Sequence, residues 1–140
     1  MNQTKLFCGA AVILLILPLI VMNPAGYAFF GFGNKPAPQY AQIEGNMQTV
    51  AMIVQPQAYA PIVVQKGIAV RWLIKVTAAN LNSCNHIVVI PKYQIRKNLQ
   101  AGENIIEFTP RETGEIPYSC QMGMIKNKIK VVDDLGKEKT

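Results

Sequence analysis

The chain has 140 residues, which is enough for one compact domain with an extension and too few for two ordinary domains. Half of the residues are apolar, so a core can be buried, and the formal charge of +6 favours attraction to anionic membrane surfaces. The basic residues are spread along the chain without a regular interleaving of aromatic side chains, which argues against a nucleic-acid-binding protein.

The first residues are typical of an export signal. After the short positive end 1-MNQTK-5, residues 6–22 are uncharged and apolar except for a glycine and a proline. Gly26 and Ala28 fit a cleavage site after residue 28. A retained membrane anchor is the alternative, because the apolar run lies at the short end of what spans a bilayer, about 17–25 residues. We therefore predict an apolar helix within residues 1–28, as signal peptide or membrane anchor, and an extracytoplasmic location for the rest: cell surface, periplasm or secreted.

The remaining chain is predicted to be all-β. Residues 29–46 contain glycines and prolines without a sustained period and are predicted to be a linker. The apolar pattern then changes to a period of two, most clearly in 67-GIAVRWLIKVT-77, which predicts a strand with one buried face. Similar short runs, separated by turn residues, lie before and after this segment, at 48–54, 61–65, 86–90, 103–108 and 124–132. This spacing predicts a β-sandwich or small barrel over residues 47–133, with a charged, frayed tail at 134–140.

Two predicted loops carry candidate metal ligands. One loop holds Cys84 and the single histidine, and the other is 117-PYSCQMGM-124; the candidates are Cys84, His86, Cys120, Met122 and Met124. Thiolate and thioether are soft donors that favour Cu(I), whereas zinc rarely accepts a thioether. Gly123 would let the backbone turn tightly beside a metal. Near the first loop, Asn80, Asn82 and Ser83 suit an Asx-type turn that could hold the ligand loop in shape.

Each candidate ligand has a plain structural alternative. In an oxidising compartment Cys84 and Cys120 could pair as a disulfide. His86 could be a hydrogen-bonded structural histidine. Met122 is expected to fill a gap in the packing rather than to bind, and serves as an alternate ligand.

Three segments resemble the cupredoxin family. The chain 86-HIVVIPKYQIRKNLQAGEN-104 looks like the family's His-x-x-x-Ile-Pro run, and 105-IIEFTPRETGEIPYSC-120 looks like the strand and turn before its ligand cysteine. Upstream, 59-YAPIVVQKGIAVRWLI-74 resembles its opening strands. The chain is most similar to small exported cupredoxin-like domains with a Cys-x-Met-Gly-Met loop, and to the copper domain of oxidase subunits. The resemblance implies a Greek-key β-sandwich.

The chain nevertheless differs from the family at the positions of its electron-transfer ligands. It places His86 at the first histidine ligand and Cys120 at the cysteine ligand. A blue-copper site needs a second histidine, which this chain lacks. A binuclear centre needs a second cysteine where Met124 stands. The remaining donors, Cys84, His86, Cys120 and Met124 with Met122 as an alternate, predict a site for one Cu(I) ion.

We therefore predict an extracytoplasmic protein that holds Cu(I) for trafficking or storage. Its expected partners are a copper donor or acceptor protein and, if the anchor is retained, the membrane. No enzyme signature is present, so we do not expect an enzyme. The alternatives are an electron-transfer cupredoxin, or a metal-free binding module with a Cys84–Cys120 disulfide that serves a membrane metal-transport system.

Overall fold

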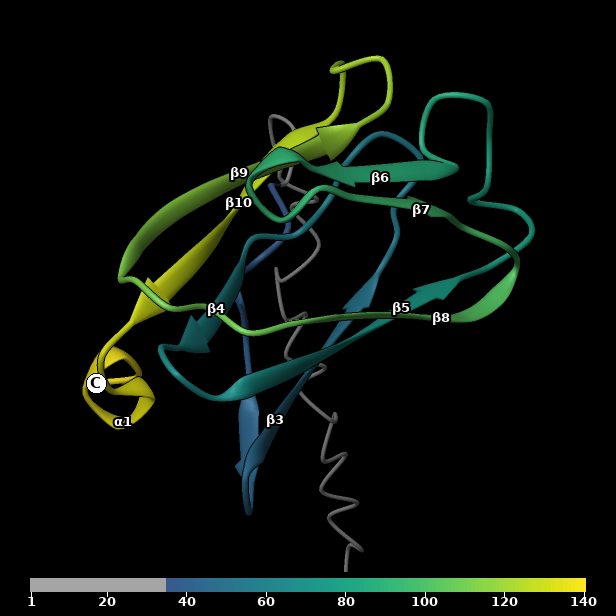
Figure 1. Cartoon of the computed structure of the whole chain (residues 1–140). Helices are drawn as coiled ribbons and strands as arrows, with labels where there is room; N and C mark the ends of the chain where they lie inside the picture. The colour runs from purple at the N-terminus through teal and green to yellow at the C-terminus, as the bar shows by residue number, and fades with distance from the viewer. Residues whose placement is uncertain (1–34) are drawn as a thin grey trace, which may run out of the picture. The chain divides into compact units, whose positions relative to one another are not determined.

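The structure, a computed structural model, describes residues 35–140. The predicted signal or anchor, 1–28, and the first residues of the predicted linker lie outside this range. Ten strands form the framework of the domain: β1 (Gln39–Tyr40), β2 (Gln42–Glu44), β3 (Met47–Ile53), β4 (Ile62–Gln65), β5 (Ala69–Val76), β6 (Ile87–Ile90), β7 (Ile95–Asn98), β8 (Gly102–Phe108), β9 (Gly114–Cys120) and β10 (Lys126–Val132). A short 3-10 helix, η1 (Pro91–Tyr93), and a final helix, α1 (Leu135–Glu138), complete it (Figure 1).

The strands form two sheets. One has the order β1-β4-β10-β9-β6-β7 and the other β2-β3-β5-β8. Side chains from both sheets meet in one core, where the rings of Trp72 on β5 and Tyr118 on β9 pack edge to face with centroids 4.9 Å apart. The predicted all-β sandwich is thereby confirmed.

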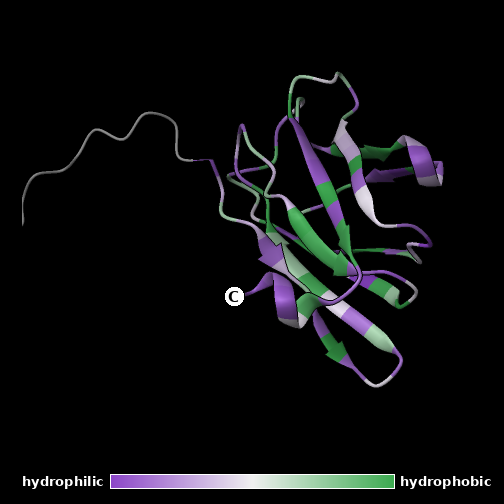
Figure 2. Ribbon diagram, turned by 90° about the vertical axis from the view of Figure 1, so that its left-hand side faces the viewer, coloured by the Kyte–Doolittle hydropathy of each residue, from purple (hydrophilic) through white to green (hydrophobic). Residues whose placement is uncertain are grey.

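The period-two pattern of β5 explains its place in the sandwich. Val70, Trp72, Ile74 and Val76 are all buried, whereas the alternating positions lie half-buried or exposed. Figure 2 shows the same alternation as green and purple bands along the strands. Because successive side chains of a strand point to opposite faces, one apolar face suffices to anchor this strand between its neighbours β3 and β8.

Regular structure extends beyond the predicted limits at both ends. Strands β1 and β2 lie within residues 29–46, which were predicted to be a linker. This segment is part of the sheets, because β1 pairs with β4 and β2 pairs with β3. Ala41, between them, is buried. At the other end, the predicted frayed tail forms α1, which Leu135 fastens by burial and Asp134 caps by accepting from the Gly136 N–H at 2.8 Å. In residues 35–140, no helix has the length and apolar character needed to cross a membrane.

Candidate metal centre

The loops before β6 and after β9 lie at the same end of the sandwich. The two strands are antiparallel neighbours, with Val88 opposite Cys120. One further bond, from the Gln121 N–H to the Ile87 carbonyl at 3.1 Å, continues the pairing into the loops. The topology therefore places both predicted ligand loops side by side.

Cys120 is the innermost of the candidate ligands. Its side chain is 1% exposed, and its sulfur accepts a hydrogen bond from the Ile125 N–H at 3.3 Å. Burial raises the pKa of the thiol, but backbone N–H groups of Ile125, Met124, Met122 and Gly123 lower it, and the net shift of the pKa is downward. The loop therefore wraps its own donors around one sulfur and stabilises the thiolate, which is the form that binds metal.

The loop after Cys120 turns at Gly123, whose φ of 68° lies in the left-handed region that glycine adopts readily. The Gly123 N–H donates to the Cys120 carbonyl at 3.0 Å and closes the turn. On this tight turn Met122 is 67% exposed and Met124 is 74% exposed. The expectation that Met122 fills a gap in the packing is wrong, because the turn holds its side chain in solvent.

The loop before β6 is fixed by asparagine side chains. The Oδ1 atom of Asn82 accepts from the Cys84 N–H at 2.8 Å and from the Asn85 N–H at 3.1 Å, so the predicted Asx-type turn is confirmed. Asn85 is fully buried, and its amide donates to the Asn80 carbonyl at 2.6 Å. The Asn82 amide reaches the Pro56 carbonyl at 2.9 Å, which ties the loop to a third segment of the chain.

Tyr59 links this loop to the region of Cys120, a role that the sequence did not reveal. Its hydroxyl donates to the Asn85 carbonyl at 2.8 Å. Burial and then the charge of Cys120 raise the pKa of this hydroxyl above its ordinary value, so it remains a donor. No sequence signal points to Tyr59, because the contact joins residues 26 positions apart.

His86 carries an unusual atom for a protein interior. It lies two residues before Val88, which faces Cys120, so a regular strand would direct both side chains to the same face. Its Nδ1 atom is buried and has no hydrogen-bond partner within the described residues. A buried polar atom without a partner costs free energy, so an atom of this kind calls for an explanation.

Cys84 is half-buried and lines a depression together with Met124. The other lining residues are Pro56, Gln57, Asn82, Ser83 and Ile125. Both Cys84 and Cys120 are free thiols. Nowhere in residues 35–140 does a group of three or more His, Cys, Asp or Glu side chains lie close enough to hold a metal ion. The candidates thus gather at one end of the sandwich without forming a closed shell of these residue types.

Comparisons with known proteins agree with this architecture, although no family model and no curated protein matches the chain. A copper binding protein solved in its apo form in solution is 28% identical, with a TM-score of 0.62 over 68% of this chain and 97% of that protein. The metal binding domain of the Streptococcus pneumoniae D39 Cu(I)-exporting P-type ATPase CopA, solved with Cu(I), is 26% identical, with a TM-score of 0.62 over 68% of this chain and 95% of that domain.

A third similar structure shows the fold alone. It is a mixed disulfide intermediate between a thioredoxin-like protein and subunit II of cytochrome c oxidase, and it matches at 12% identity with a TM-score of 0.53 over 70% of this chain and 90% of the other. The resemblance found in the sequence is confirmed: residues 35–140 form a cupredoxin-like domain.

Proposed function

We propose that this protein is an extracytoplasmic copper-binding protein that holds one Cu(I) ion for storage or hand-over. Cys84 and Cys120 would bind the ion as thiolates, and His86 and Met124 would complete the shell, with Met122 as an alternate. The role is binding rather than catalysis. The partners would be proteins that donate or accept copper, together with the membrane if the N-terminal segment is retained.

The buried Nδ1 atom of His86 is the observation that carries this proposal. Its lone pair, or its proton, has no partner in the described part of the chain, and the strand beside it ends in Cys120. A metal ion would satisfy that nitrogen, whereas a purely structural histidine would be expected to form a hydrogen bond there.

The chemistry of the donors favours Cu(I). Two thiols, one imidazole and two thioethers form a soft set that suits Cu(I) better than zinc, magnesium or Cu(II). The lowered pKa of Cys120 keeps a thiolate available. The two similar structures at 28% and 26% identity are named as a copper binding protein and as a domain solved with Cu(I), which supports the same ion.

Binding would require the outer ligands to close over the inner ones. Met124 and Met122 are exposed on a short turn, and Cys84 lies beside Met124 in the same depression. Further sulfur donors would reach Cys120 only if these exposed side chains rearranged. We therefore expect Cu(I) to order the loop after β9.

Anaerobic titration of the reduced full chain with Cu(I), against a competing chelator, tests the proposal. We expect one tight equivalent, lost in Cys120→Ser and retained in the matched control Cys8→Ser. Retention by Cys120→Ser would contradict it, as would a stable blue or purple species with Cu(II), which would indicate electron transfer. Protein prepared without reductant that shows no free thiols, and that binds no copper after reduction, would support the metal-free module instead.

A further inference from the structure

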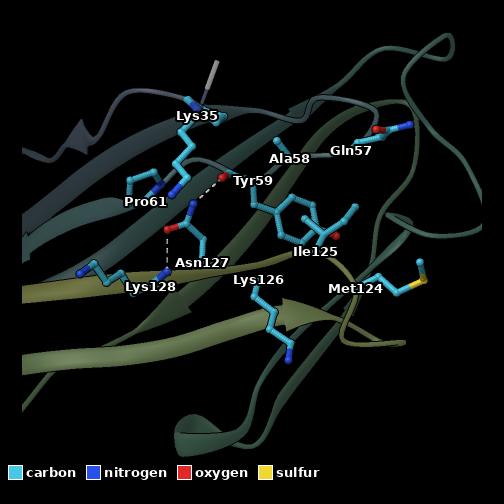
Figure 3. Close-up of a pocket in the computed structure, with 11 residues that line it drawn as sticks. Lys35, Gln57, Ala58, Tyr59, Pro61, Met124, Ile125, Lys126, Asn127 and Lys128 are labelled. Carbon is cyan, nitrogen blue, oxygen red and sulfur yellow. Dashed lines mark hydrogen bonds between the residues drawn. The ribbon is translucent and has the colours of Figure 1, made fainter. Parts of the chain in front are cut away.

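A basic depression adjoins the candidate copper site. It lies above the start of β4, with Lys35 on the β1 side and Lys126 and Lys128 on the β10 side (Figure 3). Its lining contains these three lysines and no acidic residue; the remaining lining residues are Pro36, Gln57, Ala58, Tyr59, Pro61, Met124, Ile125 and Asn127.

Met124 connects the two depressions. It lines the basic depression with Lys126 and the second depression with Cys84. A segment that fills the basic depression as far as Met124 would therefore contact an exposed thioether of the proposed copper shell. Of the residues around it, Asn127 fixes the floor by donating its amide to the Tyr59 carbonyl at 2.5 Å.

The positive charge here is largely uncompensated. Lys128 pairs with Glu115, but Lys35 and Lys126 form no ion pair within residues 35–140, and both are exposed. Arg96, which binds the Gln121 side chain at 2.6 Å, adds a further cation beside the methionine turn. The depression thus combines apolar side chains, among them the adaptable Met124, with a rim of lysines, which suits binding to a protein segment of opposite charge.

We propose that this basic depression docks an acidic segment of the protein that gives or takes Cu(I). This inference rests on the proposed function and names the chemistry of the partner. Carboxylates of the segment would face Lys35 and Lys126, and its soft ligand would meet Met124. A concave site suits a protruding peptide segment better than a flat bilayer, which would span the depression without filling it.

The test uses the metal-free full chain in bilayer nanodiscs of neutral phosphatidylcholine, with methyl-labelled methionines observed by NMR. The probe is a short peptide of aspartate and glutamate with one central methionine. We expect the peptide to shift the Met124 methyl signal. The double variant Lys35→Glu with Lys126→Glu should weaken peptide binding about tenfold at low salt, since exposed ion pairs contribute modestly each.

The matched control reverses the same number of charges at the opposite end of β10, in Lys137→Glu with Lys139→Glu, and should leave peptide affinity nearly unchanged. Equal weakening in both double variants would overturn the proposal, because it would show only a net-charge effect. A second result would also overturn the proposal. If the Met124 signal shifts when phosphatidylcholine is replaced with phosphatidylglycerol, but does not shift when the acidic peptide is added, the surface recognises anionic lipid and not a peptide.

Copper titration of the same variants separates the two proposals. The Lys35→Glu with Lys126→Glu variant should retain one equivalent of Cu(I), which shows that its fold is intact. Peptide binding without copper uptake by the wild-type chain would refute the copper site and leave the docking surface standing. Copper uptake without peptide binding would refute the docking surface alone.

Discussion

The two loops of the candidate site are built in different ways. The loop before β6 is anchored to distant segments, through the Asn82 amide on the Pro56 carbonyl and the Tyr59 hydroxyl on the Asn85 carbonyl. The loop after β9 is organised mainly around Cys120, whose sulfur accepts from the Ile125 N–H. One half of the site is thus fixed before any ligand arrives, whereas the other half can adjust around a sulfur atom.

Removing the asparagine at the centre of the fixed loop should have the largest effect. Asn85→Ala would leave buried backbone groups without partners, and we expect the free energy of unfolding to fall by about 3 kcal/mol. Because Asn85 holds the backbone between its neighbours Cys84 and His86, Cu(I) affinity should also fall at least about tenfold. Urea denaturation measures the change in stability, and copper titration measures the change in affinity.

Asn98→Ala, at an exposed position, is the control and should change the free energy of unfolding by no more than about 0.5 kcal/mol. An equally small change in Asn85→Ala would show that the first loop is not fixed in this way.

Substitutions in the adjustable loop after β9 should change the affinity for Cu(I) more than the stability of the fold. Met124→Leu removes a thioether from an exposed position, so the free energy of unfolding should change by no more than about 0.5 kcal/mol. Cu(I) affinity should weaken about tenfold, or 1.4 kcal/mol. Met122→Leu is the matched comparison and should weaken affinity less. A larger loss in Met122→Leu would assign the ligand role to Met122.

Alanine substitutions at two glycines, one in the loop after β9 and one in an ordinary turn, test whether the turn at Gly123 contributes to copper binding. Gly123→Ala and Gly45→Ala both place a side chain at a positive φ, 68° and 61°, where no backbone atom obstructs it. Each should lower the free energy of unfolding by about 1 kcal/mol. Only Gly123→Ala should also weaken copper binding, as measured by chelator competition. If both variants bind copper like the wild type, the turn at Gly123 is not part of the adjustable half.

The smallest effect concerns protonation of the inner thiol. In metal-free protein that carries Cys8→Ser and Cys84→Ser, ultraviolet thiolate absorbance should titrate below the ordinary pKa of a thiol, because backbone N–H groups lower the pKa of Cys120. Copper affinity should decline as pH falls, because protons compete with Cu(I) for the thiolate, and the lowered pKa of Cys120 shifts that decline to lower pH. Unfolding in urea should restore the ordinary value. A midpoint at or above the ordinary value in the folded protein would contradict this account of the loop.

The central strands were predictable from the sequence because their burial is a local, alternating property. The apolar face of β5 could be read directly from the spacing of Trp72 and Ile74. Strand β7 was not identified, since Ile95–Asn98 is an edge strand that pairs through its backbone with β6 and carries mostly polar side chains. The short strand β1 pairs with β4 near the edge of the domain in the same way, without an apolar pattern of its own.

The candidate ligands could be chosen from the sequence by residue type, but the structure that supports them could not. Cys84, Cys120 and Met124 were candidates because their sulfur atoms are soft donors, and His86 because it is the single histidine. The donors around the Cys120 sulfur are backbone groups, which every sequence contains, so no residue type could indicate them. The basic depression was equally hidden, because Lys35 and Lys126 come together only through the order of strands in the sheet.

The unequal burial of the sulfur atoms has a kinetic consequence for the proposed site. The weaker thioether donors lie exposed in solvent, whereas the stronger thiolate donors lie deeper, at half-buried Cys84 and at Cys120, which is 1% exposed. An arriving ion would be passed inward from weak donors to strong ones, exchanging one bond at a time. Release to a partner would follow the same donors in the reverse order, so the ion would stay bound to at least one ligand throughout.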